Sequence, residues 1–117
     1  MNLQIQNYCR SRGHSRNVVD GGLEYLVSGW RDTVTRLHAG YKRGIFEYMN
    51  DLDGRSILEE VLPLATEAER RAVLDALSTL DAEFRDLTVA SKVRVSESGN
   101  NRHYWWLYRL PPNVELA

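Results

Sequence analysis

A chain of 117 residues, 43% of them hydrophobic, has the length and apolar content of a single globular domain. Its formal net charge of -1 excludes the strong overall field that drives nonspecific binding to nucleic acids or anionic membranes. With one cysteine there is no internal disulfide, and no long uncharged run marks a signal peptide or membrane span, so we expect a cytoplasmic protein without membrane contact.

The first segment of the chain, residues 1–17, is polar and locally basic. It mixes Asn, Gln, Ser, Arg and Gly with few apolar positions, and this composition predicts an irregular or mobile lead-in. It carries Arg10, Arg12 and Arg16 without an acidic residue. If the chain binds a nucleic acid, these arginines are the expected phosphate contacts.

The strongest helical pattern begins after Asp20. Apolar side chains recur at steps of three and four over residues 23–41, as on the buried face of an amphipathic helix. Asp20 can accept hydrogen bonds from the free amides at the helix start, and Gly40 tolerates the left-handed conformation that ends many helices. We therefore expect a helix between these two residues.

Three further helices are expected before residue 88. A short one begins at Ile45, and the pentapeptide 50–54 is interpreted as a cap and turn before another short helix at 57–62. Thr66 and Glu69 match a capping box, in which each side chain satisfies a free backbone amide of the other residue. This motif predicts a long fourth helix.

The helical middle of the chain is acidic. Residues 51–90 contain ten acidic and four basic side chains. Asp81, Glu83 and Asp86 on the fourth helix represent the solvated face that we expect from this excess. Such a face would complement a protein partner with a basic surface.

An aromatic run dominates the end of the chain. Apolar residues alternate at 93–95, turn residues cluster at 96–101, and the run at 104–108 is interpreted as the returning strand of an antiparallel hairpin. The predicted fold is therefore mainly α, with about four helices around one core and a C-terminal antiparallel β-hairpin. The single domain is expected to cover residues 18–112, and residues 113–117 form a tail.

The spacing of potential metal ligands argues against a metal site. An acidic turn matches four positions of a calcium loop, but Met49 stands where the first carboxylate belongs, and Asp53 is better interpreted as a helix cap. The histidines at 14, 38 and 103 lie too far apart for zinc-ligand spacing. We expect neither a metal nor another cofactor.

No catalytic constellation is predicted. Cys9 and His14 lack a third, orienting group and an oxyanion donor, and the chain has neither a glycine-rich phosphate loop nor a nucleophile elbow. We expect a protein that is not an enzyme.

Binding of another protein is the function that the aromatic run favours, because Tyr, Trp and Arg dominate the energetics of protein interfaces. The residues at the end of the chain that belong to these types are Arg102, Tyr104, Trp105, Trp106, Tyr108 and Arg109. Packing of one or both tryptophans in the core is the competing interpretation. Two other functions stay open: nucleic-acid binding by the basic lead-in together with an exposed aromatic ring, and a non-catalytic subunit that associates through Trp30 and Tyr41.

The chain resembles bacterial immunity proteins, which neutralise toxins delivered between bacteria, in being small, mainly helical, poor in cysteine and acidic on its surface. The segment from Trp30 to Leu62 is also similar to a helical pattern in uncharacterised bacterial proteins; the residues that carry it are Tyr41, Gly44, Glu47, Tyr48, Asn50, Asp51, Leu52 and Arg55. The first resemblance implies inhibition of a toxin by direct occlusion of its active site.

Overall fold

The computed structural model describes residues 2–96 and 104–114. Within this range the helices are α1 (Leu3–Ser11), α2 (Arg16–His38), α3 (Ile45–Val61) and α4 (Glu67–Leu87), with 3₁₀ turns η1 (Leu62–Leu64) and η2 (Trp105–Tyr108). The strands are β1 (Val89–Ala90) and β2 (Arg109–Leu110), which pair antiparallel. The mainly helical fold with one core and a C-terminal two-stranded antiparallel sheet is therefore confirmed.

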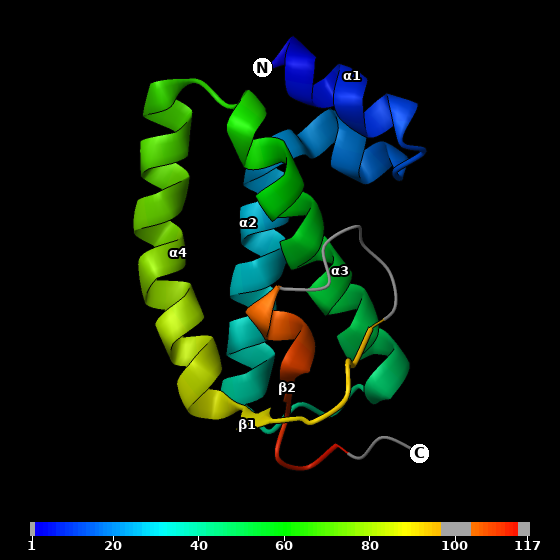
Figure 1. The fold of residues 1–117 in the computed structure, drawn as a ribbon, viewed down its shortest axis with the longest axis vertical. Coiled ribbons are helices and arrows are strands. Elements are labelled where there is room, and N and C mark those ends of the chain that lie inside the picture. The colour runs from blue at the N-terminus through cyan, green and yellow to red at the C-terminus, as the bar shows by residue number, and fades with distance from the viewer. Residues whose placement is uncertain (1, 97–103, 115–117) are drawn as a thin grey trace.

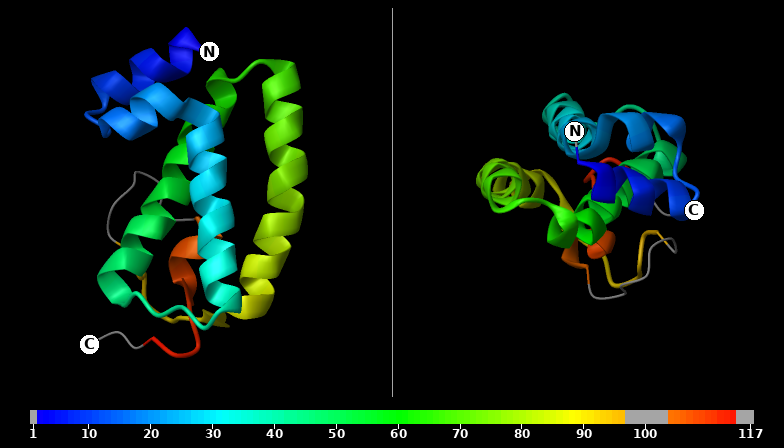
Figure 2. Two further views of the ribbon diagram at one scale, coloured as in Figure 1. Left: turned by 180° about the vertical axis from the view of Figure 1, so that it is seen from behind. Right: turned by 90° about the horizontal axis from the view of Figure 1, so that it is seen from above.

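The three long helices form the body of the molecule. Helix α2 packs against both α3 and α4, and the view from behind shows it between them (Figure 2). On the opposite side, η2 lies across the opening between α3 and α4 (Figure 1). Trp106 and Leu107 of η2 are 1% and 0% exposed, so the end of the chain completes the core. None of the described helices is long and apolar enough to cross a membrane.

Helix α1 stands where an irregular lead-in was predicted. The Asn2 side chain accepts a hydrogen bond from the amide of Ile5 and caps the helix start. Ile5 and Cys9, four residues apart, are buried in the core, and α1 packs against α2. The polar composition of this segment did not indicate a helix. Two apolar positions are enough to hold one in place when the rest of the domain supplies the surface on which they pack.

Helix α2 begins earlier than predicted. The Ser15 hydroxyl accepts from the amide of Val18, so Ser15 is the cap, and Asp20 lies inside the helix. At Gly22 the backbone adopts φ 56° and ψ -138°, which kinks the helix. Gly40 has φ 92° just beyond the last turn, in agreement with its predicted role as a terminator.

Helix α3 runs straight through the predicted turn at 50–54. Side chains spaced three and four residues apart along it, Tyr48, Leu52, Arg55 and Leu58, are all buried. This burial outweighs the roughly 1 kcal/mol by which Gly54 disfavours a helix. Asp53 is therefore not a helix cap; its carboxylate accepts a hydrogen bond from the Ser96 hydroxyl at 2.8 Å. At the next boundary the capping box of Thr66 and Glu69 is present as predicted.

The aromatic run is a 3₁₀ turn and not a strand. Among the described residues, only the two pairs that join β1 to β2 form a ladder. Val95 is buried and its amide donates to the carbonyl of Leu107, whereas Val93 is exposed. In this turn Trp106 and Leu107 enter the core, while Trp105 and Tyr108 on either side of them are only partly buried. The predicted turn at 96–101 lies, apart from Ser96, outside the described residues.

Candidate partner-binding surfaces

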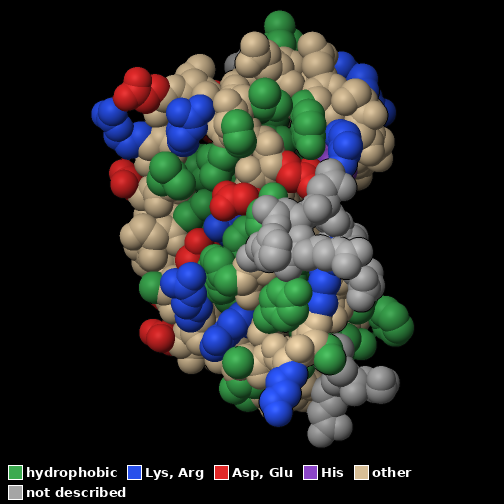
Figure 3. Space-filling model, in the orientation of Figure 1, with side chains coloured by type: hydrophobic (Ala, Val, Ile, Leu, Met, Phe, Trp, Pro, Cys, Tyr) green, Lys and Arg blue, Asp and Glu red, His purple; other side chains and the backbone are tan. Residues whose placement is uncertain are grey.

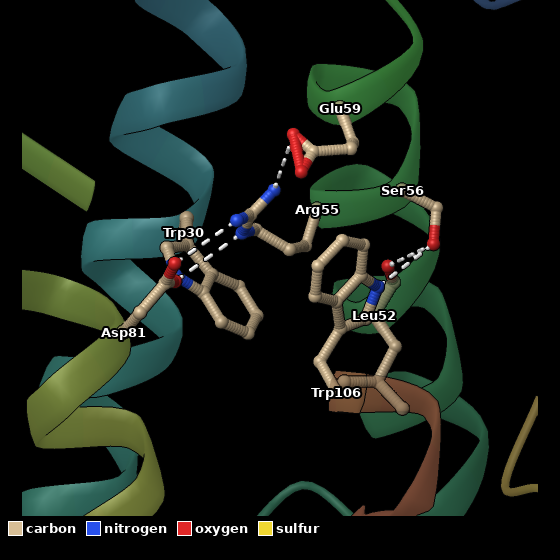
Figure 4. A network of polar contacts seen from close by, with 7 residues as sticks. All are labelled: Trp30, Leu52, Arg55, Ser56, Glu59, Asp81 and Trp106. Atoms are coloured by element: carbon tan, nitrogen blue, oxygen red, sulfur yellow. Dashed lines mark hydrogen bonds and ion pairs between the residues drawn. The ribbon is translucent and has the colours of Figure 1, made fainter. Parts of the chain in front are cut away.

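A buried arginine organises the centre of the helical body (Figure 4). Arg55 is 3% exposed, and its Nη2 and Nε donate to the carboxylate of Asp81 at 2.9 and 3.2 Å. Trp30 Nε1 donates to the same carboxylate at 2.9 Å, and Glu59 lies 3.7 Å from Arg55 Nη1. The Arg55 guanidinium also sits 4.1 Å from the ring centre of Trp106. This network links α2, α3, α4 and η2.

The network corrects the predicted acidic face. Asp81 does not belong to a solvated surface, because it turns inward and neutralises Arg55 across the interface of α3 and α4. Glu83 is partly buried, and Asp86 is exposed. Of the three acidic residues assigned to partner binding, Asp86 alone is exposed.

The two adjacent tryptophans of η2 have different environments. Trp106 is in the core, and its Nε1 donates to the Ser56 hydroxyl at 2.9 Å. Trp105 is only partly buried, and the guanidinium of the exposed Arg85 lies 4.0 Å from its ring centre. Tyr104 stacks on Trp106 with ring centres 4.6 Å apart. The core interpretation thus holds for Trp106, and Trp105 is accessible.

Arg109, another predicted binding residue, is engaged within the fold. Its guanidinium donates to the Thr88 hydroxyl and carbonyl at 3.0 and 2.7 Å and to the carbonyl of Arg85 at 2.9 Å. It therefore satisfies backbone acceptors at the end of α4. Arg102 lies outside the described residues.

We use the name aromatic surface for four side chains near η2 that keep solvent access: Arg85, Tyr104, Trp105 and Tyr108. In the view of Figure 3, Lys and Arg side chains lie around hydrophobic ones in the lower half, and acidic side chains lie mostly at mid-height and above. The surface therefore combines aromatic area with positive charge.

The basic residues near the N-terminus occupy the other end of the molecule. Arg10, Arg12 and Arg16 are exposed around the turn between α1 and α2, far from η2 in Figure 1. Arg12 packs over the ring of Tyr8, with 5.9 Å to the ring centre, and Arg16 pairs with Asp20. These arginines and the aromatic surface do not form one site.

A cavity of about 740 Å³ lies between the α1–α2 turn, α2 and α3. We call it the α2–α3 cavity. Six of the residues that line it are His14, Tyr25, Trp30, Asp53, Gly54 and Glu60. Sequence analysis missed this site because its walls come from three distant segments.

Three residues considered as functional candidates from the sequence are buried in the structure: Cys9, Trp30 and Tyr41. Cys9 is fully buried, and burial together with the nearby charge of Glu60 raises the pKa of its thiol, which disfavours the nucleophilic thiolate. Trp30 and Tyr41 are 2% and 1% exposed, so they belong to the core and not to a subunit interface. Across the described ranges, no group of three or more His, Cys, Asp or Glu side chains is placed to hold a metal ion.

The sequence matches no protein-family model, and comparisons with curated proteins and with solved structures return no match.

Proposed function

We propose that this protein acts by binding another protein through the aromatic surface. The observation that carries the proposal is the environment of Trp105: its ring is partly accessible, an arginine lies against it, and the residues that follow it are anchored in the core. Trp, Tyr and Arg are the residue types that contribute most to binding energy at protein interfaces.

Rigidity of the surface favours this role. Trp105 makes edge contacts with Phe84 and Trp106, with ring centres 5.8 and 5.5 Å apart, so its side chain is already held before a partner arrives. A preordered anchor loses less side-chain entropy on binding than a mobile one. Arg85 beside the ring favours a partner that places a carboxylate there.

Inhibition of the partner is the form of binding that we favour. A small rigid domain can block an active site by direct contact, which is what the resemblance to bacterial immunity proteins implies. Arg85 gives the surface positive charge, so a toxin domain that presents an acidic residue beside an apolar patch fits it.

The test is capture of the partner from native lysate after nuclease treatment, followed by measurement of its affinity for variants. Trp105→Ala is expected to weaken binding roughly 30-fold, the effect of losing about 2 kcal/mol at an interface anchor. Leu74→Ala is the control, since Leu74 is a large exposed apolar residue on α4 that does not belong to the aromatic surface. Equal affinity of both variants contradicts the proposal.

A nucleic-acid partner is the alternative that this experiment separates. The arrangement favours it less, because the arginine-rich turn is remote from the aromatic surface and the guanidinium of Arg85 already lies against the ring of Trp105. Recovery of nucleic acid that declines steeply as salt rises, without a protein in stoichiometric amount, would reverse this ranking.

A further inference from the structure

The α2–α3 cavity is a second candidate binding site, separate from the aromatic surface. Its rim includes exposed residues, among them Tyr25, which is 46% exposed, so the cavity opens to solvent. Gly29 and Gly54 line it from two helices, and a methyl group added at either position would meet no atom within 4 Å. The two glycines therefore keep space open and are not needed for close packing of the helices.

Two polar groups in this cavity lack adequate partners within the described part of the chain. His14 Nε2 is buried there without a hydrogen-bond partner. Among those same residues, the carboxylate of Glu60 has one hydrogen bond, from the Tyr8 hydroxyl at a long 3.3 Å, and no ion pair. Buried polar atoms in native proteins are normally paired, so His14 Nε2 indicates a place for a further hydrogen-bond partner. The partly buried carboxylate of Glu60 can accept more than its one long hydrogen bond.

The charge of the cavity favours a cationic ligand. Among the described residues that line it are three carboxylates, those of Asp51, Asp53 and Glu60, and one guanidinium, that of Arg12. Tyr41 and Ser96 donate to the first two, which leaves Glu60 as the carboxylate with the weakest internal bond. The part of the chain described contains no cluster that could hold a metal ion, which favours an organic cation.

The shape of the walls favours a guanidinium group over an ammonium group. The polar groups come from different segments, with His14 in the α1–α2 turn and Glu60 on α3, and the half-exposed aromatic residue Tyr25 lines the same space. A guanidinium offers five donors in a flat fork and stacks on aromatic rings, whereas an ammonium is a compact point charge.

We propose that the α2–α3 cavity binds an arginine side chain of the protein partner, with Glu60 as the carboxylate that receives it and His14 Nε2 as a second acceptor. This inference rests on the proposed function, since it names a group that the partner must present. It concerns a site other than the aromatic surface.

A peptide probe tests the inference without the partner. The isotope-labelled chain is titrated with the capped tripeptide Gly-Arg-Gly, and the amide signals of Gly29 and Gly54 are followed by NMR. We expect saturable shifts of these signals, no binding of the same peptide with citrulline in place of arginine, and at least tenfold weaker binding to Glu60→Gln. Glu67→Gln removes an exposed carboxylate outside the cavity and should bind as the unmodified chain does.

Three results would overturn the proposal: no saturable shift, equal binding of the citrulline peptide, or unchanged affinity of Glu60→Gln. Agmatine that binds at least tenfold more tightly than the tripeptide would identify a free small cation as the ligand and also overturn it. Because the titration contains no partner and partner capture is tested at Trp105, failure of the cavity proposal can be distinguished from failure of the proposed function.

Discussion

Arg55 carries a positive charge inside the helical body, where an unpaired charge is costly. Asp81 and Glu59 supply negative charge, and the indole of Trp106 covers the guanidinium. Because Asp81 also accepts from Trp30, one carboxylate stabilises two donors from different helices. The energetic consequence of losing Arg55 is therefore larger than the loss of a surface ion pair.

Replacement of Arg55 by Met should destabilise the protein by about 3 kcal/mol. The change leaves the mostly buried Asp81 without its cation, and breaking one side of a buried pair costs on the order of 3 to 5 kcal/mol. The lower end applies because the Asp81 side chain is still 17% exposed. Urea unfolding followed by circular dichroism measures the difference.

The double variant Arg55→Met with Asp81→Asn is the control for this prediction. Asparagine removes the uncompensated charge and keeps an oxygen that can accept from Trp30 Nε1, so most of the lost stability should return. A double variant as unstable as the sum of the two single variants would show that packing, and not charge pairing, dominates at Arg55.

Glycines at two positions within helices have opposite roles. Gly54 lies in α3 with open space around it, so Gly54→Ala should stabilise the protein by roughly 1 kcal/mol through helix propensity. Gly22 forms the kink of α2 with φ 56° and ψ -138°, a conformation that strains any side chain, so Gly22→Ala should destabilise by more than 1 kcal/mol. Thermal unfolding of the two variants provides the comparison, and a shift of the same sign for both contradicts it.

The capping box at the start of α4 predicts a pH dependence. The Thr66 amide and then the Asn2 side chain donate to Glu69, which lowers its pKa below the ordinary value of 4.5. Its contribution to stability is therefore present above pH 4.5 and is lost as the pH falls through the lower folded value. Urea midpoints from pH 7 to pH 3 should fall less steeply for Glu69→Gln than for the unmodified chain. Parallel curves would contradict this assignment.

Local signals predicted some elements well and others badly. The capping box at Thr66 and the terminating glycine at position 40 act within a few residues, so the sequence alone reveals them. Helix α1 depends on packing against α2, and α3 continues through 50–54 because its buried side chains outweigh the turn-forming residues. The alternation of side chains expected of a strand does not describe the aromatic run, because Trp105–Tyr108 forms a 3₁₀ turn that packs against the helices.

The sites were harder to predict than the fold. Composition favoured Trp105 and Trp106 equally as candidate binding residues. The contact of Trp106 with Ser56 and its burial in the core, which distinguish the two, depend on the folded chain. Asp81 looked like a solvated acid because its partner, Arg55, is 26 residues away. The α2–α3 cavity has no sequence signature, because the proximity of His14 to Glu60 arises only when the whole chain is folded.

At the scale of the whole molecule, two buried tyrosines predict loss of stability in alkali. Burial raises the pKa of both Tyr41 and Tyr48 far above the ordinary value of 10.0, and a hydrogen bond to Asp51 adds to the effect at Tyr41. The resulting stability is fully present below pH 10 and is lost as the pH rises above it, because the unfolded chain ionises first.

Absorbance of tyrosinate and helical circular dichroism, recorded together from pH 9 to pH 12, test this prediction. Part of the tyrosinate absorbance should appear only at the pH where the helical circular dichroism is lost. In Tyr48→Phe this late increase in absorbance should be smaller. Its hydroxyl donates to the carbonyl of Arg109, so the variant is also expected to be somewhat less stable at neutral pH, by about 1 kcal/mol. Complete ionisation near pH 10 with the helices intact would contradict the prediction.

The contribution of η2 to the core has a consequence for synthesis of the protein. Trp106 and Leu107 are translated after all four helices, and Asn113, which donates to the carbonyls of Gly40 and Tyr41, comes later still. A nascent chain that ends before Tyr104 therefore has an open apolar seam between α3 and α4. The core is complete only once Trp106 and Leu107 have left the ribosome. Until then the apolar surface that they cover is exposed to chaperones and to aggregation.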